Sequence, residues 1–202
     1  MAVTDILTET EALEAINATD AGSNLADLRR AVSAVSQAID AACGPVVARE
    51  VTEVHVGGVS RIWPYQPPVL SVTTLTEFDG TTSTVLTDET PFGTVGGSTG
   101  FVVGAGWLER RSGGAAYRFA GQVQVVYQAG RFATTAEVGE RWKYAAGAIL
   151  QRLWKREGSA WAYSPDFYAN TDEQAAGPQF FRAVAPMIDE FLWDEKRPPA
   201  VA

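Results

Sequence analysis

Residues 123–158 constrain the fold most, because they join a strand to a long helix through one glycine corner. The strand part, Val123–Tyr127, is a β-branched run typical of a buried strand. Thr134 followed by Glu137 has the spacing of a capping box, in which each side chain accepts a hydrogen bond from the other residue's backbone N–H. The pattern predicts an amphipathic helix over 135–157. Its core-facing stripe consists of Val138, Trp142, Ala145, Ala146, Ile149 and Leu153.

The composition indicates a folded, acidic chain. With 202 residues and 46% hydrophobic content, the chain is long enough to bury one good core. Its 16 basic and 24 acidic residues give a net charge of −8, which disfavours a protein that grips a phosphate backbone. A single cysteine permits no internal disulfide, and the sequence has neither a signal-peptide pattern nor the roughly 20 apolar residues of a membrane span. We therefore expect a soluble protein of cytoplasmic origin.

Local signals predict three further helices. Thr8 and Glu11 form a second capping box, which opens a short helix. Ser23 is placed to cap a stronger helix that ends at Gly44. A C-terminal helix is predicted to run from Gln179 or Pro186 to Glu195, before a Pro-Pro pair. The apolar positions of the second helix follow the 3-4 spacing of a core-facing stripe and are Leu25, Leu28, Val32, Val35, Ile39 and Ala42.

Between these helices the sequence is rich in Val, Thr, Gly and aromatic residues, which favours strands. Together the elements predict an α+β chain: a mainly helical body with an antiparallel β region inserted over 46–127. Residues 1–45 form the first part of that body, and residues 128–202 complete it with the long helix, a loop and the C-terminal helix. The predicted strands are Val46–Val56, Ser60–Ile62, Leu70–Glu77, Thr84–Leu86, Gly100–Leu108 and Tyr117–Tyr127.

Catalytic and metal chemistry find little support in the sequence. His55, the only histidine, lies in an alternating strand pattern and is expected at the surface or on a sheet edge. Cys43 lies beside the apolar face of a helix and is expected to be a buried, inert thiol. One histidine and one cysteine cannot make an ordinary structural zinc site, and the pair Arg110-Arg111 is expected to be surface charge. We therefore expect no enzymatic activity, no metal and no cofactor.

Several large aromatic residues lie off the predicted core stripes, and exposed tryptophans often mark a contact with a partner. Trp193 points away from the stripe of the C-terminal helix, and Trp154 lies to one side of the stripe of the long helix. The chain has a net negative charge, no recognisable set of catalytic residues and several aromatic residues without a predicted core partner. Together these features indicate a protein that assembles with other protein chains. The candidate assembly contacts are Trp154, Phe180, Phe181, Phe191 and Trp193.

Four short segments follow one another in an informative order. They are Ile39–Gly44 at a helix end, Pro67–Thr73 in the β region, Val125–Gly130 at the strand-to-helix junction, and Ala148–Trp154 in the long helix. In this order they resemble the head-tail connector (adaptor) proteins of tailed bacteriophages. The resemblance covers most of the chain, although each segment alone is short and apolar.

The resemblance implies a structural virion protein that forms a ring, usually a dodecamer, beneath the portal and extends the DNA channel. Its expected partners are the portal protein, neighbouring copies of itself and the next neck, stopper or tail protein. DNA would pass only as cargo, no membrane would be involved and no catalysis is expected. The expected location is the neck of the virion, with the host cytoplasm as the place of assembly.

Two alternatives stay open. The chain could be another neck protein, either a stopper or a tail-completion protein, which would share its acidic and β-containing character. It could also be a carbohydrate-binding module, in which the β region presents Trp63, Tyr65 and Trp107 as a platform for stacking sugars.

Overall fold

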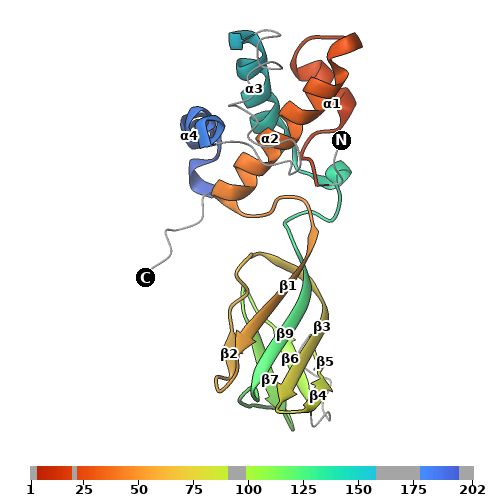
Figure 1. Ribbon diagram of the computed structural model, residues 1–202, viewed down its shortest axis with the longest axis vertical. Coiled ribbons are helices and arrows are strands. Elements are labelled where there is room, and N and C mark those ends of the chain that lie inside the picture. Colours follow the sequence, from red (N-terminus) through yellow and green to blue (C-terminus); the bar gives the residue numbers. More distant parts are fainter. Residues whose placement is uncertain (1–3, 20–21, 91–98, 158–177, 196–202) are drawn as a thin grey trace. The chain divides into compact units, whose positions relative to one another are not determined.

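The computed structural model describes residues 4–19, 22–90, 99–157 and 178–195. The chain divides into two compact units (Figure 1). The helical unit consists of Met1–Val47 together with Phe132–Ala202, and the β unit is the continuous segment Ala48–Arg131. Each unit has its own hydrophobic core.

Four α-helices make up the described part of the helical unit. They are α1 (Glu9–Ala15), α2 (Leu25–Cys43), α3 (Glu140–Glu157) and α4 (Pro178–Leu192). Short 3-10 helices lie at Gly22–Asn24, Thr135–Glu137 and Trp193–Glu195. None of the helices in the described residues is long and apolar enough to cross a membrane.

The start of α1 is a capping box, as the sequence predicts. The Thr8 hydroxyl accepts a hydrogen bond from the backbone N–H of Glu11 at 3.3 Å, and the Glu11 carboxylate accepts one from the Thr8 N–H at 2.7 Å. The start of α2 differs from the prediction, because a 3-10 helix precedes it and moves the cap from Ser23 to Asn24. Gly44 ends α2 as predicted, at a φ of 88° that favours glycine.

The predicted start of α3 is wrong. Thr134 makes no side-chain capping bond, and residues 135–137 form a separate 3-10 helix. Val138 then takes an extended conformation, with φ −58° and ψ 126°, so the α-helix begins only at Glu140. The Val138 side chain is buried in this extended conformation, so it contributes to the core without belonging to the α-helix.

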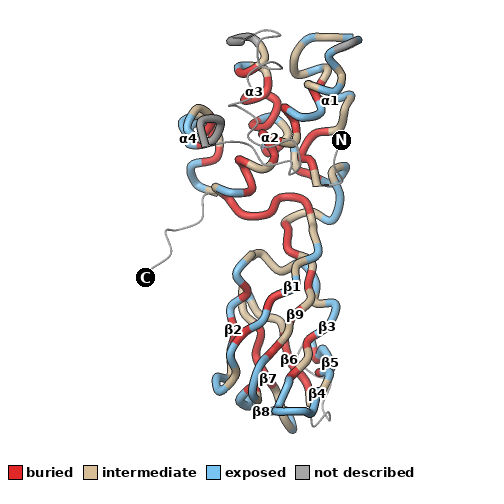
Figure 2. Tube along the Cα trace, in the orientation of Figure 1, coloured by how far each residue is buried: buried red, intermediate tan, exposed pale blue. Residues whose placement is uncertain are grey.

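The core of the helical unit is centred on α2, which is buried along most of its length (Figure 2). Trp142 and Ile149 from α3 and Ala12 from α1 belong to the same core. Each fully buried aliphatic side chain stabilises the fold by about 1.5–3 kcal/mol relative to an exposed one. Cys43 is buried, as predicted. Helix α4 contributes Val184, Ile188 and Leu192 to the same core.

The first sheet of the β unit has four strands in the order β1-β9-β3-β4, all antiparallel. These strands are β1 (Arg49–Val56), β9 (Gln122–Ala129), β3 (Val69–Asp79) and β4 (Thr82–Val85). The second sheet has the order β2-β7-β6-β5, with β8 paired to β7, and its β5–β6 pair is parallel. Its strands are β2 (Arg61–Ile62), β5 (Thr87–Asp88), β6 (Gly100–Val103), β7 (Leu108–Ser112) and β8 (Ala115–Ala116).

The two sheets share one core, so they pack against each other. Leu75, Val125 and Tyr127 enter it from the first sheet, and Phe101 and Leu108 enter it from the second. The side chains of the first sheet alternate in burial along β9, which places one face of that sheet inward and the other outward.

The strand boundaries differ from the prediction at several places, and two of the differences arise at glycines. The predicted strand Val46–Val56 begins only at Arg49, and the short strands β5 and β8 were not predicted. The predicted strand Gly100–Leu108 is divided between β6 and β7 by a turn in which Gly106 has a φ of 85°. A residue with a Cβ is strained in that conformation, so glycine permits the reversal. The predicted strand Tyr117–Tyr127 begins later, at Gln122, because Gly121 with a φ of 48° forms a corner before it.

The expected fold class, a mainly helical body with an inserted antiparallel β region, is wrong. In the described residues the strands form two sheets, of which one is mixed, and these sheets have a core separate from that of the helices. The physical reason is that the β segment is not an appendage of a helical core. Its strands bury aliphatic residues, aromatic residues and ion pairs between two sheets, and this gives the segment a separate core.

Candidate assembly surface

Aromatic side chains that are exposed or half-buried occur on α3, on α4 and directly after α4. Trp193 is 72% exposed in the 3-10 helix that follows α4, and Tyr144 is 70% exposed on α3. Phe191 is half-buried and meets Tyr144 edge-on, with 5.9 Å between ring centroids and an interplanar angle of 87°. Trp193 follows Phe191 by two positions in the sequence, and we call the set Tyr144, Phe191 and Trp193 the α3–α4 aromatic surface. Exposed aromatic groups of this kind cost free energy in water and favour a partner.

The sequence-predicted contacts are not all brought together. Phe191 and Trp154 are both half-buried and pack against the helical core, whereas Trp193 is exposed. Trp154 lies ten positions after Tyr144, which places it about 80° away around α3 at 100° per residue. Helix α4 includes the backbone of Phe180 and Phe181, but their side chains lie outside the described residues.

Sequence reasoning missed Tyr144. It lies on the charged side of α3 and so outside the apolar stripe that sequence patterns detect. A signal was present, because a tyrosine between Arg141 and Arg152 on the polar side of a helix is an aromatic residue without a predicted core partner. The same argument had selected Trp193.

Ion pairs border the aromatic surface and tie α4 to α3. The two terminal guanidinium nitrogens of Arg152 donate to the Glu190 carboxylate, at 2.5 and 2.8 Å, and its guanidinium carbon lies 5.0 Å from the centre of the Phe191 ring. Arg141 donates to the Asp194 carboxylate, with one of the two bonds at 3.1 Å. Hydrogen bonds from these arginines hold the pKa of Glu190 and of Asp194 below their usual values. The pairs therefore persist to lower pH than unpaired carboxylates would allow.

A buried polar cluster lies in the first sheet of the β unit, around Glu53. One carboxylate oxygen accepts a 2.6 Å hydrogen bond from the Tyr127 hydroxyl, and the other accepts a 2.9 Å bond from the backbone N–H of Tyr65. His55 Nε2 lies 3.1 Å from the latter oxygen, and the His55 ring stacks on Tyr65 with centroids 4.7 Å apart. Of the two positions expected for His55, the sheet edge is correct because β1 is an edge strand, but the side chain is buried against Glu53 rather than at the surface.

A second buried pair joins the two sheets. Arg110 Nε lies 2.9 Å from Glu77 Oε1, and both side chains are buried. The same carboxylate accepts a 3.2 Å hydrogen bond from the backbone N–H of Ala120, and Arg110 also donates to the carbonyl oxygen of Gly100 at 3.2 Å. The expectation that Arg110 is surface charge is wrong. Its burial is possible because Glu77 neutralises it within a hydrogen-bonded site.

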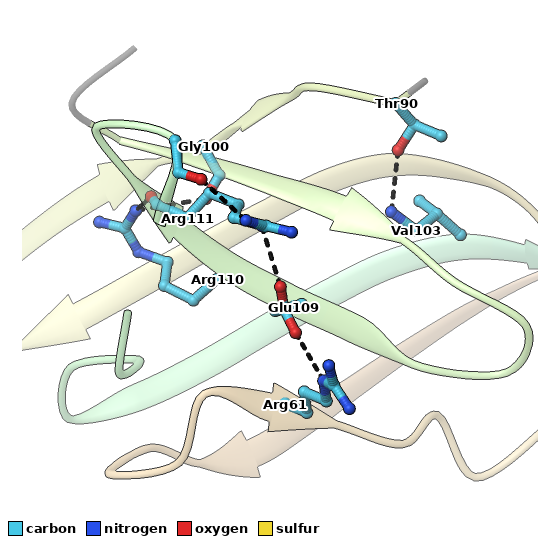
Figure 3. Close-up of polar contacts among 8 residues, drawn as sticks. Arg61, Thr90, Gly100, Val103, Glu109, Arg110 and Arg111 are labelled. Carbon is cyan, nitrogen blue, oxygen red and sulfur yellow. Dashed lines mark hydrogen bonds and ion pairs between the residues drawn. The ribbon is translucent and has the colours of Figure 1, made fainter. Parts of the chain in front are cut away.

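On the outer side of the second sheet, Glu109 bridges two arginines (Figure 3). Its carboxylate lies 2.6 Å from Arg61 Nε and 2.9 Å from Arg111 Nε, and the glutamate is almost fully buried. The Arg61 guanidinium also lies over the Trp107 ring, 4.6 Å from its centre. The charged groups on this side of the second sheet therefore have their ionic partners within the β unit.

The residues of the possible sugar platform have different surroundings. Trp63 is 61% exposed. The ring of Tyr65 stacks on His55, and the ring of Trp107 lies against both Arg61 and the backbone of Gly104. Among the described residues, no group of three or more histidine, cysteine, aspartate or glutamate side chains is placed to hold a metal ion.

Comparisons with known proteins give structural likenesses. No family model matches the chain, and no curated protein matches it. A chain of the structure described as "Neck of empty GTA particle computed with C6 symmetry" has a TM-score of 0.53 and 16% identity, over 77% of this chain and 84% of that chain. A chain of "Neck of native GTA particle computed with C12 symmetry" has a TM-score of 0.47 and 17% identity, over 100% of this chain and 98% of that one. At this identity, the first likeness shows that this chain shares its fold with a chain from the neck of a GTA particle.

Proposed function

We propose that this protein is a neck protein of a tailed, phage-like particle, and that it acts as a head-tail connector beneath the portal. The observation that carries the proposal is the shared fold with a chain from the neck of a gene transfer agent particle, over 77% of this chain and 84% of that one. The order of the four connector-like segments in the sequence supports it independently.

In the proposed assembly, copies close into a ring through a heterologous contact, in which one side of a subunit meets a different surface of the next. The α3–α4 aromatic surface forms one side of this contact between copies, or else it contacts the portal. Covering its exposed rings removes apolar surface from water, which favours binding. We expect a dodecamer, with the portal above and the next neck or tail protein below. The function requires no catalytic step.

The charge of the chain is consistent with a DNA channel. A net charge of −8 per subunit repels phosphate, so DNA passes along such a ring without being held. The buried and ion-paired arginines of the β unit support this, since Arg61, Arg110 and Arg111 are each engaged with a carboxylate.

Reconstitution with purified portal protein tests the proposal. We expect electron microscopy of the mixture to reveal an added ring on one end of the portal, and we expect the protein to be located in the neck of intact particles. A protein that leaves portals undecorated, or that occupies a layer not in contact with the portal, would refute the connector role. The second result would favour a stopper.

A matched pair of substitutions tests the aromatic surface. We expect Trp193→Ala to reduce portal decoration while leaving thermal unfolding unchanged, because Trp193 is largely exposed in the subunit. Trp63→Ala, which removes an exposed tryptophan from the β unit, is the control and should leave decoration unchanged. Equal effects of the two substitutions would contradict the assignment of this surface.

A further inference from the structure

The loop of residues 63–68, between β2 and β3, is attached to the first sheet through two of its backbone N–H groups. The N–H of Tyr65 donates to one carboxylate oxygen of Glu53 at 2.9 Å, and the N–H of Gln66 donates to the Tyr127 hydroxyl at 3.2 Å. That hydroxyl in turn donates to the other carboxylate oxygen of Glu53 at 2.6 Å. One buried carboxylate therefore holds two consecutive residues of the loop, the first directly and the second through a tyrosine.

His55 contacts both this carboxylate and the loop. Its Nε2 lies 3.1 Å from the Glu53 oxygen that accepts from Tyr65, and its ring stacks on the Tyr65 ring at an interplanar angle of 28°. An ionised carboxylate only accepts hydrogen bonds, so His55 Nε2 is the donor in this contact. A change in the charge of His55 therefore acts on the loop through two contacts, one with the carboxylate that holds the loop and one with a ring of the loop itself.

The other charged groups on the inward face of the first sheet lie farther from His55. The register aligns His55 with Val123 on β9 and then with Glu77 on β3, so Glu77 is two strands away, or about 10 Å at the usual strand spacing. Glu77 is itself paired with Arg110 of β7 at 2.9 Å. Glu53 is therefore the charged group that responds most directly to a proton on His55.

We infer that Glu53, His55 and Tyr127 form a pH-dependent latch, which holds the loop of residues 63–68 more tightly when His55 is protonated. Histidine is the side chain whose charge ordinarily changes between about pH 5 and 8, and His55 is the only histidine of the chain. A proton on His55 turns its contact with Glu53 into a charge-assisted hydrogen bond and places a cation against the face of the Tyr65 ring.

The direction of the pH effect follows from linkage. The closed loop supplies the Tyr65 ring and keeps the carboxylate of Glu53 in place beside His55, so His55 binds its proton more tightly when the loop is closed. Lower pH therefore favours the closed loop, and this contribution is lost as the pH rises. Because Trp63 and Tyr65 are 61% and 67% exposed, the latch determines how firmly two exposed aromatic side chains are held. The inference concerns the β unit and does not depend on the proposed function.

Amide hydrogen exchange, followed by NMR on the full-length protein, tests the latch. The measured quantity is the protection factor, the ratio of the intrinsic to the observed exchange rate, which removes the intrinsic pH dependence of exchange. We expect the protection factors of the Tyr65 and Gln66 amides to be at least about threefold higher near pH 5.5 than near pH 8. The Val46 amide is the internal control, because it donates to the carboxylate of Asp40 at 2.9 Å within the helical unit. Its protection factor should be the same at both pH values.

His55→Gln is the matched variant. Glutamine can donate a hydrogen bond to Glu53 but cannot take up a proton, so the contact is retained and its pH dependence is removed. We expect the protection factor of the Tyr65 amide in this variant to be the same at the two pH values. A pH dependence as large as that of wild type would overturn the inference.

The titration of His55 provides a second measurement that needs no variant. Because the chain has a single histidine, the ring proton resonances report the charge of His55 without ambiguity. We expect the midpoint of this titration to coincide with the pH at which the protection of the loop amides changes. A ring that keeps one charge state between about pH 5 and 8, or loop protection that is equal or lower at the lower pH, would overturn the inference. This result decides the question even if His55→Gln does not fold.

Discussion

At the scale of single residues, two buried carboxylates organise the interior of the β unit. Glu53 receives bonds from a tyrosine hydroxyl and a backbone N–H beside His55, and Glu77 pairs with Arg110. Moving such charges out of water is costly, so each site is stable only as a complete set of partners. The need to keep each carboxylate beside its partners explains why the strands that carry Glu53 and Glu77 have a single register.

Trp142 should be the most costly aromatic residue to remove from the helical unit. It is 5% exposed and packs in the core between α3 and α2. We expect Trp142→Ala to lower the free energy of unfolding by about 3–5 kcal/mol, because it empties a large packed site. Trp193→Ala is the control and should change that free energy by less than about 0.5 kcal/mol. Urea unfolding followed by circular dichroism measures both, and similar losses would show that Trp142 is not a core residue.

Glu11 should make the stability of the helical unit depend on pH. Partial burial raises its pKa, but hydrogen bonds from Lys143 and Thr8 outweigh that effect and lower the pKa below its usual value. The ionised form therefore stabilises the folded state at neutral pH, and this contribution is lost as pH falls through the lowered pKa.

The comparison with Glu11→Gln isolates this effect. Wild type should be the more stable protein at neutral pH, and its advantage should shrink from about pH 5 downward as Glu11 is protonated. Urea unfolding of both proteins along a pH series measures the difference. An advantage that stays constant down to about pH 3 would be inconsistent with a lowered pKa.

At the scale of elements, the sequence predicts best where one local signal decides the structure. The Thr8–Glu11 box opens α1 as expected, whereas the same spacing at Thr134–Glu137 opens only a 3-10 turn, which the extended Val138 separates from α3. Strand β7 was missed as a separate element, since its charged run looks exposed in the sequence. The acids and bases that allow its burial lie on other strands, and local sequence does not reveal them.

The same limit applies to the candidate assembly surface. Trp193 was selected because it lies off an apolar stripe, and it is exposed. Trp154 was selected by the same argument but is half-buried against the core, since a helix wheel does not show which neighbour covers its flank. Whether any of these residues forms an assembly contact stays a prediction.

Gly147 sets the distance between α1 and α3. A Cβ atom at this position would lie 3.3 Å from the Ala15 Cβ, so a larger side chain must push the helices apart. We expect Gly147→Val to destabilise the helical unit by about 1–3 kcal/mol through overpacking. Hydrogen exchange should become faster in α1. A double-mutant cycle with Ala15→Gly provides the check, because a cost that Ala15→Gly does not reduce would place the strain elsewhere.

At the scale of the whole molecule, the chain consists of two units with separate cores. The sequence indicated both a helical part and a β part, but it overstated the helical part. The cause is physical: amphipathic helices give strong periodic signals over many residues, whereas short strands of two to five residues give weak ones.

The β unit should fold without the helical unit. Its core is complete within residues 48–131, and its buried charges find their partners there. We expect the isolated segment to give dispersed amide resonances and one cooperative thermal transition. A segment that stays unfolded on its own would mean that its core depends on the helices.

The two ends of the β unit are neighbours, and this has a consequence for the evolution of such chains. Arg49 pairs with Ala129 across β1 and β9, and Val47 bridges to Phe132, so the chain leaves the helical unit and returns to it at neighbouring points. A segment with adjacent ends can be lost, lengthened or replaced in one genetic event without displacing the helices. Descendants of a common ancestor should therefore differ most in length and sequence between positions 48 and 131, and should retain the helical apolar spacing on either side.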